Sequence, residues 1–394
     1  MSETQQLMRS TAPQAEPIYH GILLRGPTHP NAAASPQEAC QAVLTQLDAL
    51  ALAPQVSAQS GQDVRGPWLR LKLKPSALNK WAPGFDTLRL CEALRLDTEN
   101  QPADLRREIL VAMLMGPIEF EFPSMDELVS AVRIRQYIVQ NARKTTLAFH
   151  TTEAERPEDC WTYQEDRGFT VLPGADLIQA LTKATQPEVS GTLYAFSCYR
   201  ATEYVTLLGI AQELTQSNPA LLVQLETLWT QRAIQSGEFH EVFLREQGSM
   251  DAPLPPRYFV PGERTWFRNP DEPSSNASGY EGSWVMYLGG GLFTNFWKQD
   301  QPYTLVSKCV EIYHWRHAVF LDAQGDERID EDKVQALVEA SLANPAEVTR
   351  IMAVMARYRE PRGVYTDAGG CVDTTREFAR WVRPETANLI LPKA

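Results

Sequence analysis

The chain has 394 residues, of which 43% are apolar and 22% are charged, which is typical of a globular protein with two or three domains and argues against wholesale disorder. Its 37 basic and 49 acidic residues give a formal net charge of −12 at pH 7. An acidic surface repels phosphate groups, which argues against nucleic acid and membrane partners, and no apolar stretch approaches the roughly 20 residues that cross a bilayer.

The cysteines and the N-terminus indicate a reducing compartment. Residues 1–20 are polar and lack the apolar segment of a secretory signal. The six cysteines are scattered and form no Cys-x-x-Cys pair, which excludes a zinc ribbon and a thioredoxin-type motif. We therefore expect free thiols in a cytoplasmic protein, or in one exported without a cleaved signal.

The first part of the chain predicts a tail and an α+β domain. Residues 1–35 are rich in Pro, Ala, Ser and Gln and predict a mobile tail. Residues 36–150 predict a domain of unknown, structural or docking role, because no catalytic group of residues occurs there. Its predicted elements are a helix starting at Ser35-Pro36, a strand at Trp68–Leu73, and helices at Ala103–Met115 and Ser124–Arg143.

The polar stretch Thr151–Arg167 is a candidate domain boundary, after which helices and strands alternate. We expect a core domain over residues 168–320 and a helical extension over 325–394. The predicted helices are 174–185, 198–214, 219–234, 330–342, 344–358 and 373–382, and the predicted strands are 265–267, 279–288, one starting at Leu292, and 304–313.

Cys198 is the candidate nucleophile. Ser197 is a good N-cap, so Cys198 falls in the first turn of a long helix. There the helix dipole favours the thiolate, and free backbone N–H groups can hold an oxyanion. Cys371 follows a glycine turn, but Asp373 or Thr374 is the better cap, which leaves Cys371 outside the predicted helix.

The strands that follow carry a resemblance. The segment Pro261–Pro270 reads Pro-Gly-Glu-Arg-Thr-Trp-Phe-Arg-Asn-Pro, and 282–291 reads Gly-Ser-Trp-Val-Met-Tyr-Leu-Gly-Gly-Gly. With the cysteine-led helix, this layout resembles the small bacterial spore-coat transglutaminases, a family of protein-glutamine gamma-glutamyltransferases with an NlpC/P60-like, papain-like core. The resemblance covers about residues 191–297. It implies an α+β fold of helices on an antiparallel sheet, no metal or other cofactor, and Cys198 as nucleophile.

The resemblance also implies a glutamate before Tyr-Leu-Gly and a histidine after the glycine turn, but this chain has Ser283 and Phe296 there. Glu281 is a substitute for the glutamate, since residues two apart in a strand face the same side. His314 is the first substitute for the histidine, ahead of the alternatives His317 and His240.

The sequence thus predicts acyl transfer from a glutamine carboxamide to a lysine amine or water through a thioester of Cys198. Glu281 and His314 are the other two predicted catalytic residues. The expected partners are proteins that carry glutamine and lysine, without nucleic acid or membrane. Two alternatives keep the same fold: an NlpC/P60-type cell-wall peptidase or amidase, and an inactive scaffold or binding module. The oligomeric state stays open.

Overall fold

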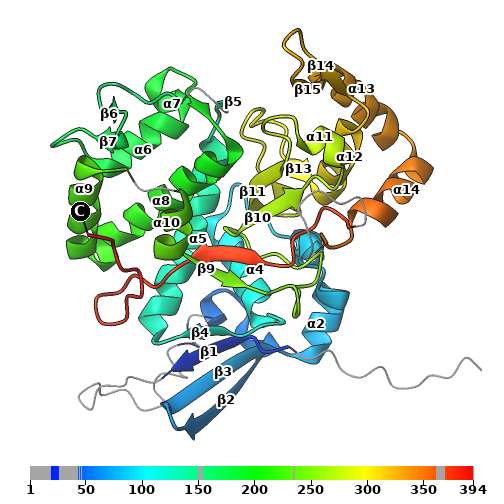
Figure 1. The fold of residues 1–394 in the computed structure, drawn as a ribbon. Coiled ribbons are helices and arrows are strands. Elements are labelled where there is room, and N and C mark those ends of the chain that lie inside the picture. Colours follow the sequence, from blue (N-terminus) through cyan, green and yellow to red (C-terminus); the bar gives the residue numbers. More distant parts are fainter. Residues whose placement is uncertain are drawn as a thin grey trace, which may run out of the picture.

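The computed structural model describes residues 19–25, 43, 45, 47–149, 154–233, 236–360 and 369–393. Most of the predicted tail over residues 1–35, and the start of the helix at Ser35-Pro36, lie outside these ranges, but residues 22–25 of that segment form strand β1 of a sheet and are not a tail. The fold is mixed α+β, as predicted (Figure 1). Among the described residues, no helix combines the length and the apolarity that crossing a bilayer requires.

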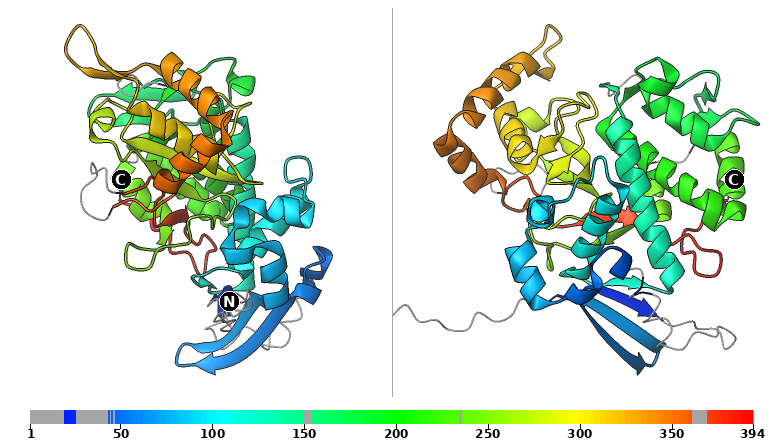
Figure 2. Two further views of the ribbon diagram at one scale, coloured as in Figure 1. Left: turned by 90° about the vertical axis from the view of Figure 1, so that its right-hand side faces the viewer. Right: turned by 180° about the vertical axis from the view of Figure 1, so that it is seen from behind.

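A four-stranded sheet forms one end of the molecule, below the helices in both views of Figure 2. Its order is β2-β3-β1-β4. The strands are β1 (Ile22–Arg25), β2 (Val56–Asp63), β3 (Gly66–Leu73) and β4 (Phe120–Phe122). In β3 the side chains of Leu69, Leu71 and Leu73 alternate into the core, which confirms the predicted strand.

The centre of the fold is the pair of long helices α5 (Met125–Lys144) and α8 (Cys198–Ser217). Ser124 caps α5 by accepting a hydrogen bond from the backbone N–H of Glu127 at 3.1 Å. Gly209 of α8 lets the two helices approach closely: a Cβ atom there would lie 2.7 Å from Cγ1 of Ile138. The helix α8 therefore packs against its neighbour at a distance that only glycine permits.

Helix α8 is buried on every face. Its contacts are with α5, α6 (Leu177–Thr185), α9 (Pro219–Gln231), α10 (Ser236–Phe243) and strand β11 (Gly282–Gly289). All residues from Ala201 to Ala211 are buried. A helix that is buried all round belongs to a core, and here it holds its first residue, Cys198, at a fixed place.

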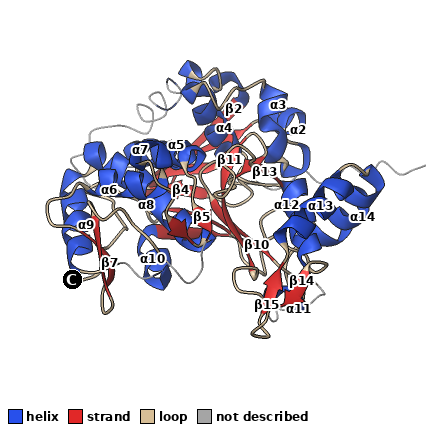
Figure 3. Ribbon diagram, turned by 90° about the horizontal axis from the view of Figure 1, so that it is seen from above, coloured by secondary structure: helices blue, strands red, loops and turns tan. Residues whose placement is uncertain are grey.

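A six-stranded sheet lies beside α8, with the order β13-β12-β11-β10-β16-β9. Its pairings are antiparallel. The bounds are β9 (Leu244–Gln247), β10 (Arg264–Arg268), β11, β12 (Leu292–Phe293), β13 (Tyr303–Thr304) and β16 (Arg376–Ala379). The predicted strands at 265–267, 279–288 and Leu292 are thus confirmed. Figure 3 shows β10 and β11 between the α6–α10 helices and the later helices.

Two predicted elements are wrong. The predicted strand 304–313 is helix α12 (Leu305–Trp315), because Thr304 and Ser307 form a reciprocal capping box. The predicted helix 373–382 contains strand β16, which pairs with β9 along its whole length and touches β10 at Arg264. The last part of the chain is therefore helical only in its first half, and then returns to the sheet.

The other predicted helices are confirmed within a few residues. The remaining described elements are α2 (Pro75–Trp81), η2 (Ala53–Gln55), η3 (Pro83–Phe85), η4 (Thr87–Arg89), α3 (Leu90–Leu94), α4 (Pro102–Leu114), β5 (Ala148–Phe149), β6 (Trp161–Gln164), β7 (Gly168–Val171), α7 (Pro187–Ser190), β8 (Ala195–Phe196), α11 (Glu272–Ser275), β14 (Val319–Leu321), β15 (Glu327–Ile329), α13 (Glu331–Leu342) and α14 (Pro345–Met355).

The close crossing of α5 and α8 can be tested by adding atoms to it. We expect Gly209→Val to lower the free energy of unfolding by about 1–3 kcal/mol, because its side chain has no room beside Ile138. The matched control is Gly237→Ala in α10, where a Cβ meets nothing within 4 Å. Urea unfolding measures both variants, and equal stability of Gly209→Val and the wild type would contradict the packing argument.

Candidate active site

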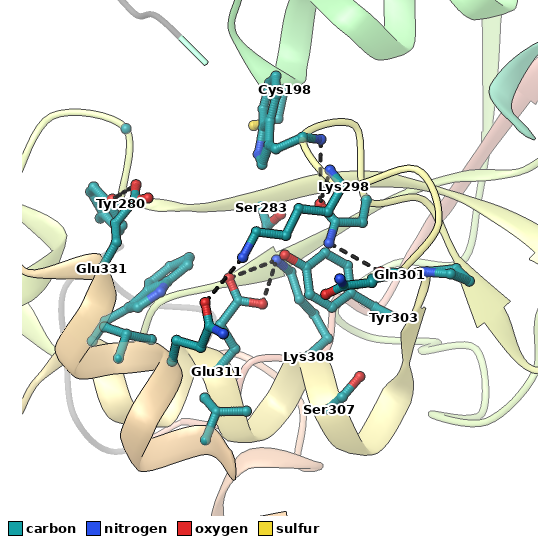
Figure 4. Close-up of a pocket in the computed structure, with 18 of the residues that line it drawn as sticks. Cys198, Tyr280, Ser283, Lys298, Gln301, Tyr303, Ser307, Lys308, Glu311 and Glu331 are labelled. Carbon is teal, nitrogen blue, oxygen red and sulfur yellow. Dashed lines mark hydrogen bonds and ion pairs between the residues drawn. The ribbon is translucent and has the colours of Figure 1, made fainter. Parts of the chain in front are cut away.

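A cavity of about 440 Å³ lies between α8, β11, α12 and α13 (Figure 4). Cys198 lies in one wall of the cavity, and Lys308 and Glu311 of α12 lie in the wall opposite. Ser283 of β11 stands between these two walls. The predicted nucleophile therefore lines a concave site whose walls come from elements far apart in the sequence.

The start of α8 is held in place on both sides of Cys198. Ser197 caps the helix as predicted, accepting a hydrogen bond from the backbone N–H of Arg200 at 3.3 Å. The ring of Tyr199 packs edge-on against the ring of Trp284 in β11, with 5.2 Å between centroids. The first turn of α8 is thereby fixed to the strand that forms the middle of the cavity.

A buried arginine supports these two rings from behind. The Arg264 guanidinium lies 4.8 Å from the ring centre of Tyr199 and 4.5 Å from that of Trp284. It also pairs with the carboxylate of Glu377 in β16. The C-terminal strand therefore takes part in positioning the cavity wall.

The surroundings of the Cys198 sulfur favour its neutral form. Burial raises the pKa of this thiol, and the negative charge of Glu281 raises it further. The backbone N–H groups of Trp284 and Tyr199 and the charge of Lys308 lower the pKa, but burial is the largest cause. Burial therefore opposes the thiolate that the helix start favours, and the reactive thiolate at Cys198 stays a prediction.

The strand beside Cys198 places Ser283 and Glu281 differently. Strand β11 begins at Gly282, where a Cβ atom would lie 2.3 Å from Nε1 of Trp266. Ser283 follows and lines the cavity. Glu281 precedes the strand, is exposed and does not line the cavity, although its charge acts on the Cys198 sulfur. The catalytic role of Glu281 stays a prediction.

None of the three candidate histidines lines this cavity. Nε2 of His314 lies 2.7 Å from Oγ of Ser341, and its Nδ1 lies 3.1 Å from Nδ1 of His317. Nδ1 of His240 lies 2.8 Å from the carboxylate of Glu377. Burial and the neighbouring His317 lower the pKa of His314, so this imidazole is neutral at pH 7. Its catalytic role stays a prediction, without a contact to the cavity.

Helix α12 brings two ionisable groups to the cavity that the sequence analysis missed. The side chain of Lys308 is only 3% exposed, and its Nζ lies 3.4 Å from each carboxylate oxygen of Glu311. The ammonium also lies 3.9 Å from the ring centre of Tyr303. Residues three apart share one face of a helix but lie on opposite faces of a strand, so the strand prediction separated this pair. The Thr304–Ser307 capping box is the sequence signal that indicates a helix here and would have placed the two residues on one face.

The chain matches a known protein family. A family model described as protein-glutamine gamma-glutamyltransferase matches residues 90–390, well over half of the chain. The chain belongs to the protein-glutamine gamma-glutamyltransferase family. This confirms the predicted family.

Among solved structures, the chain is similar to a transglutaminase from Geobacillus stearothermophilus without its C-terminal extension. The identity is 18% and the TM-score is 0.36, over 55% of this chain and 98% of that chain. No curated protein matches.

Of the five cysteines in the described part of this transglutaminase-family chain, Cys198 is the one that lines the 440 Å³ cavity. Cys91 lines a separate cavity of about 600 Å³. The rival Cys371 is fully buried, with its Sγ 3.4 Å from that of Cys309, and burial raises the pKa of its thiol. The described residues form no group of three or more side chains that could hold a metal ion.

The raised pKa of Cys198 predicts how its alkylation depends on pH. The thiolate is the form that reacts with iodoacetamide. We therefore expect the Cys198 rate to keep rising above pH 8.5, about where a free cysteine is half ionised. Peptide mapping by mass spectrometry measures the rate at each cysteine. A rate that is already constant between pH 6 and pH 7 would show that the thiol is ionised at rest.

Proposed function

We propose that this protein transfers the acyl group of a protein glutamine to an amine, with Cys198 as the nucleophile. The observation that carries the proposal is the place of Cys198, at the first residue of a buried helix and in the wall of a cavity, in a chain of the protein-glutamine gamma-glutamyltransferase family. The substrates are proteins that present a glutamine side chain and a lysine side chain.

The reaction runs in two halves. The Cys198 sulfur attacks the glutamine carboxamide, ammonia leaves, and a thioester forms. A lysine amine then attacks the thioester and gives a cross-link, whereas water gives glutamate. The backbone N–H groups of Trp284 and Tyr199 lower the pKa of the sulfur, so they stabilise the negative charge that develops on it when its proton leaves.

The fold that we propose for the core is papain-like. Helix α8 with its leading cysteine packs on strand β11, and β11 is part of an antiparallel sheet. We assign residues 168–320 to this core, 36–150 to an N-terminal α+β domain, and 325–394 to an extension whose helix α13 lines the cavity. The extension supplies Gln335 and Glu339 to that wall.

Family membership favours transfer to a side chain over cleavage of a backbone, and the cavity has a volume that suits it. Its volume of about 440 Å³ accommodates a pair of extended side chains, and the lining from α13 and from the segment before β11 encloses it on two sides. Tyr280 and Glu331 join these two sides through a hydrogen bond of 2.7 Å. We therefore rank transamidation ahead of a cell-wall peptidase.

The test is incorporation of a fluorescent primary amine into casein. We expect Cys198→Ala to abolish it, since the alanine cannot form the thioester. The matched control is Cys91→Ala, which removes another partly exposed thiol but leaves the 440 Å³ cavity unchanged.

Loss of activity in Cys91→Ala alone would contradict the assignment of the nucleophile. An inactive wild type that still binds casein would favour the scaffold alternative. Release of peptide fragments from cell-wall peptides, without amine incorporation, would favour the peptidase alternative.

A further inference from the structure

The cavity around Cys198 lacks the acid–base groups that the sequence analysis expected. Ser283 stands where a glutamate is expected, and Phe296 is buried and does not line the cavity. Among the residues that the structure describes, no histidine lines the cavity. Transfer of an acyl group from an amide nevertheless requires a proton donor, because the departing nitrogen must leave as ammonia rather than as an amide anion. Another ionisable group of the cavity must therefore move the proton.

The ionisable side chains of the cavity differ in how deeply they lie. Lys298, Glu331, Asp332 and Glu339 are exposed. Glu331 in addition accepts the hydrogen bond of the Tyr280 hydroxyl. Solvent screens charges at such positions and makes them weak partners for a buried sulfur. They belong to the rim of the cavity.

Lys308 and Glu311 are the lining ionisable pair that lies inside. The Lys308 side chain is 3% exposed and the Glu311 side chain 20% exposed. Burial and the charge of Glu311 raise the pKa of the nearby Tyr303 phenol, which therefore stays protonated and supplies no base. Taking an ammonium group out of water costs several kcal/mol, and a contact of 3.4 Å to one carboxylate is a long one. This placement suits a group with a chemical task at the cavity.

We propose that Lys308 is the general acid and base of the Cys198 site, with Glu311 as the residue that positions it. Figure 4 shows the two side chains on the wall opposite Cys198, with the side chain of Lys298 drawn between the two walls. The proposal rests on the function proposed above and names the group that moves protons in it.

Protons are conserved in both halves of the reaction. In the first half the S–C bond forms and the C–N bond breaks, while Lys308 donates one proton to the departing nitrogen and regains the proton of the thiol. In the second half the N–C bond to the incoming amine forms and the S–C bond breaks. Lys308 donates one proton to the departing sulfur and then takes one from the attacking nitrogen, so the thiol and the Lys308 ammonium are both restored.

The electrostatics of the cavity agree with this placement. The charge of Lys308 lowers the pKa of the Cys198 thiol, so the two groups interact across the cavity. The other groups around the sulfur are the backbone N–H groups of Tyr199 and Trp284, which also lower the pKa, and Glu281, which raises it. Removal of the Lys308 charge therefore moves the ionisation of the thiol to higher pH.

The experiment compares three variants in amine incorporation and in alkylation by iodoacetamide. We expect Lys308→Met to lower kcat by about 100-fold or more, the usual contribution of a general acid–base group, and to shift the alkylation profile of Cys198 to higher pH. Lys308→Arg keeps the charge but cannot exchange its proton, so we expect a normal alkylation profile with a kcat that stays low. Lys333→Met is the control, since it makes the same change at an exposed position outside the cavity.

Circular dichroism shows whether each variant is folded, and Lys308→Arg carries the test if Lys308→Met is unfolded. An active wild type with unchanged kcat in Lys308→Met or Lys308→Arg would overturn the acid–base role. A wild type without any amine incorporation would instead overturn the proposed function. The alkylation profiles would then still show whether Lys308 acts on the sulfur.

Discussion

The site depends on one constraint, which is that helix α8 is buried on every face. Close packing against α5 at Gly209, against α6 and α9, and against β11 leaves the helix no freedom to shift. Its N-terminal residue, Cys198, is thereby held at the edge of the core, where the packed interior meets the cavity. A nucleophile on a mobile loop would have no such reference point, and the sulfur could not keep a fixed distance from α12.

The burial of this helix also affects the electrostatics of the Cys198 thiol. Burial in the cavity wall favours the neutral form of the Cys198 thiol, and we expect the thiol to lose its proton during the reaction. The positive charge of Lys308 and two backbone N–H groups oppose this preference without overcoming it. Such a site protects the thiol from adventitious alkylation and oxidation, and it makes the protein dependent on a proton acceptor for every turnover.

Local signals predicted most of the elements that build the site. Ser197 and Ser124 mark the starts of α8 and α5, and the alternating residues of β10 and β11 mark the sheet. The prediction failed where two patterns compete. Residues 304–313 contain Val306, Val310 and Ile312, which favour a strand, but the Thr304–Ser307 cap and the tertiary contacts of α12 decide for a helix.

The failure at 373–382 has a different cause. Its polar start resembles a helix cap, whereas strand β16 forms because β9 and β10 offer unpaired backbone groups that lie far away in the sequence. The sequence does not single out Lys308 for a similar reason. The role that we propose for this residue depends on α12 facing Cys198 across the cavity. The spacing of residues along the sequence does not reveal that these two segments face each other.

The place of β16 in the sheet has a consequence for biosynthesis. β16 lies between β9 and β10 and supplies Glu377 to the arginine behind the rings of Tyr199 and Trp284 (Figure 1). The ribosome releases this strand only after the whole segment between β10 and β16 has been made, so the sheet stays incomplete during that time. A nascent chain thus passes through a state in which the edges of β9 and β10 are open and the wall behind Cys198 lacks the Glu377–Arg264 pair, until β16 has left the ribosome.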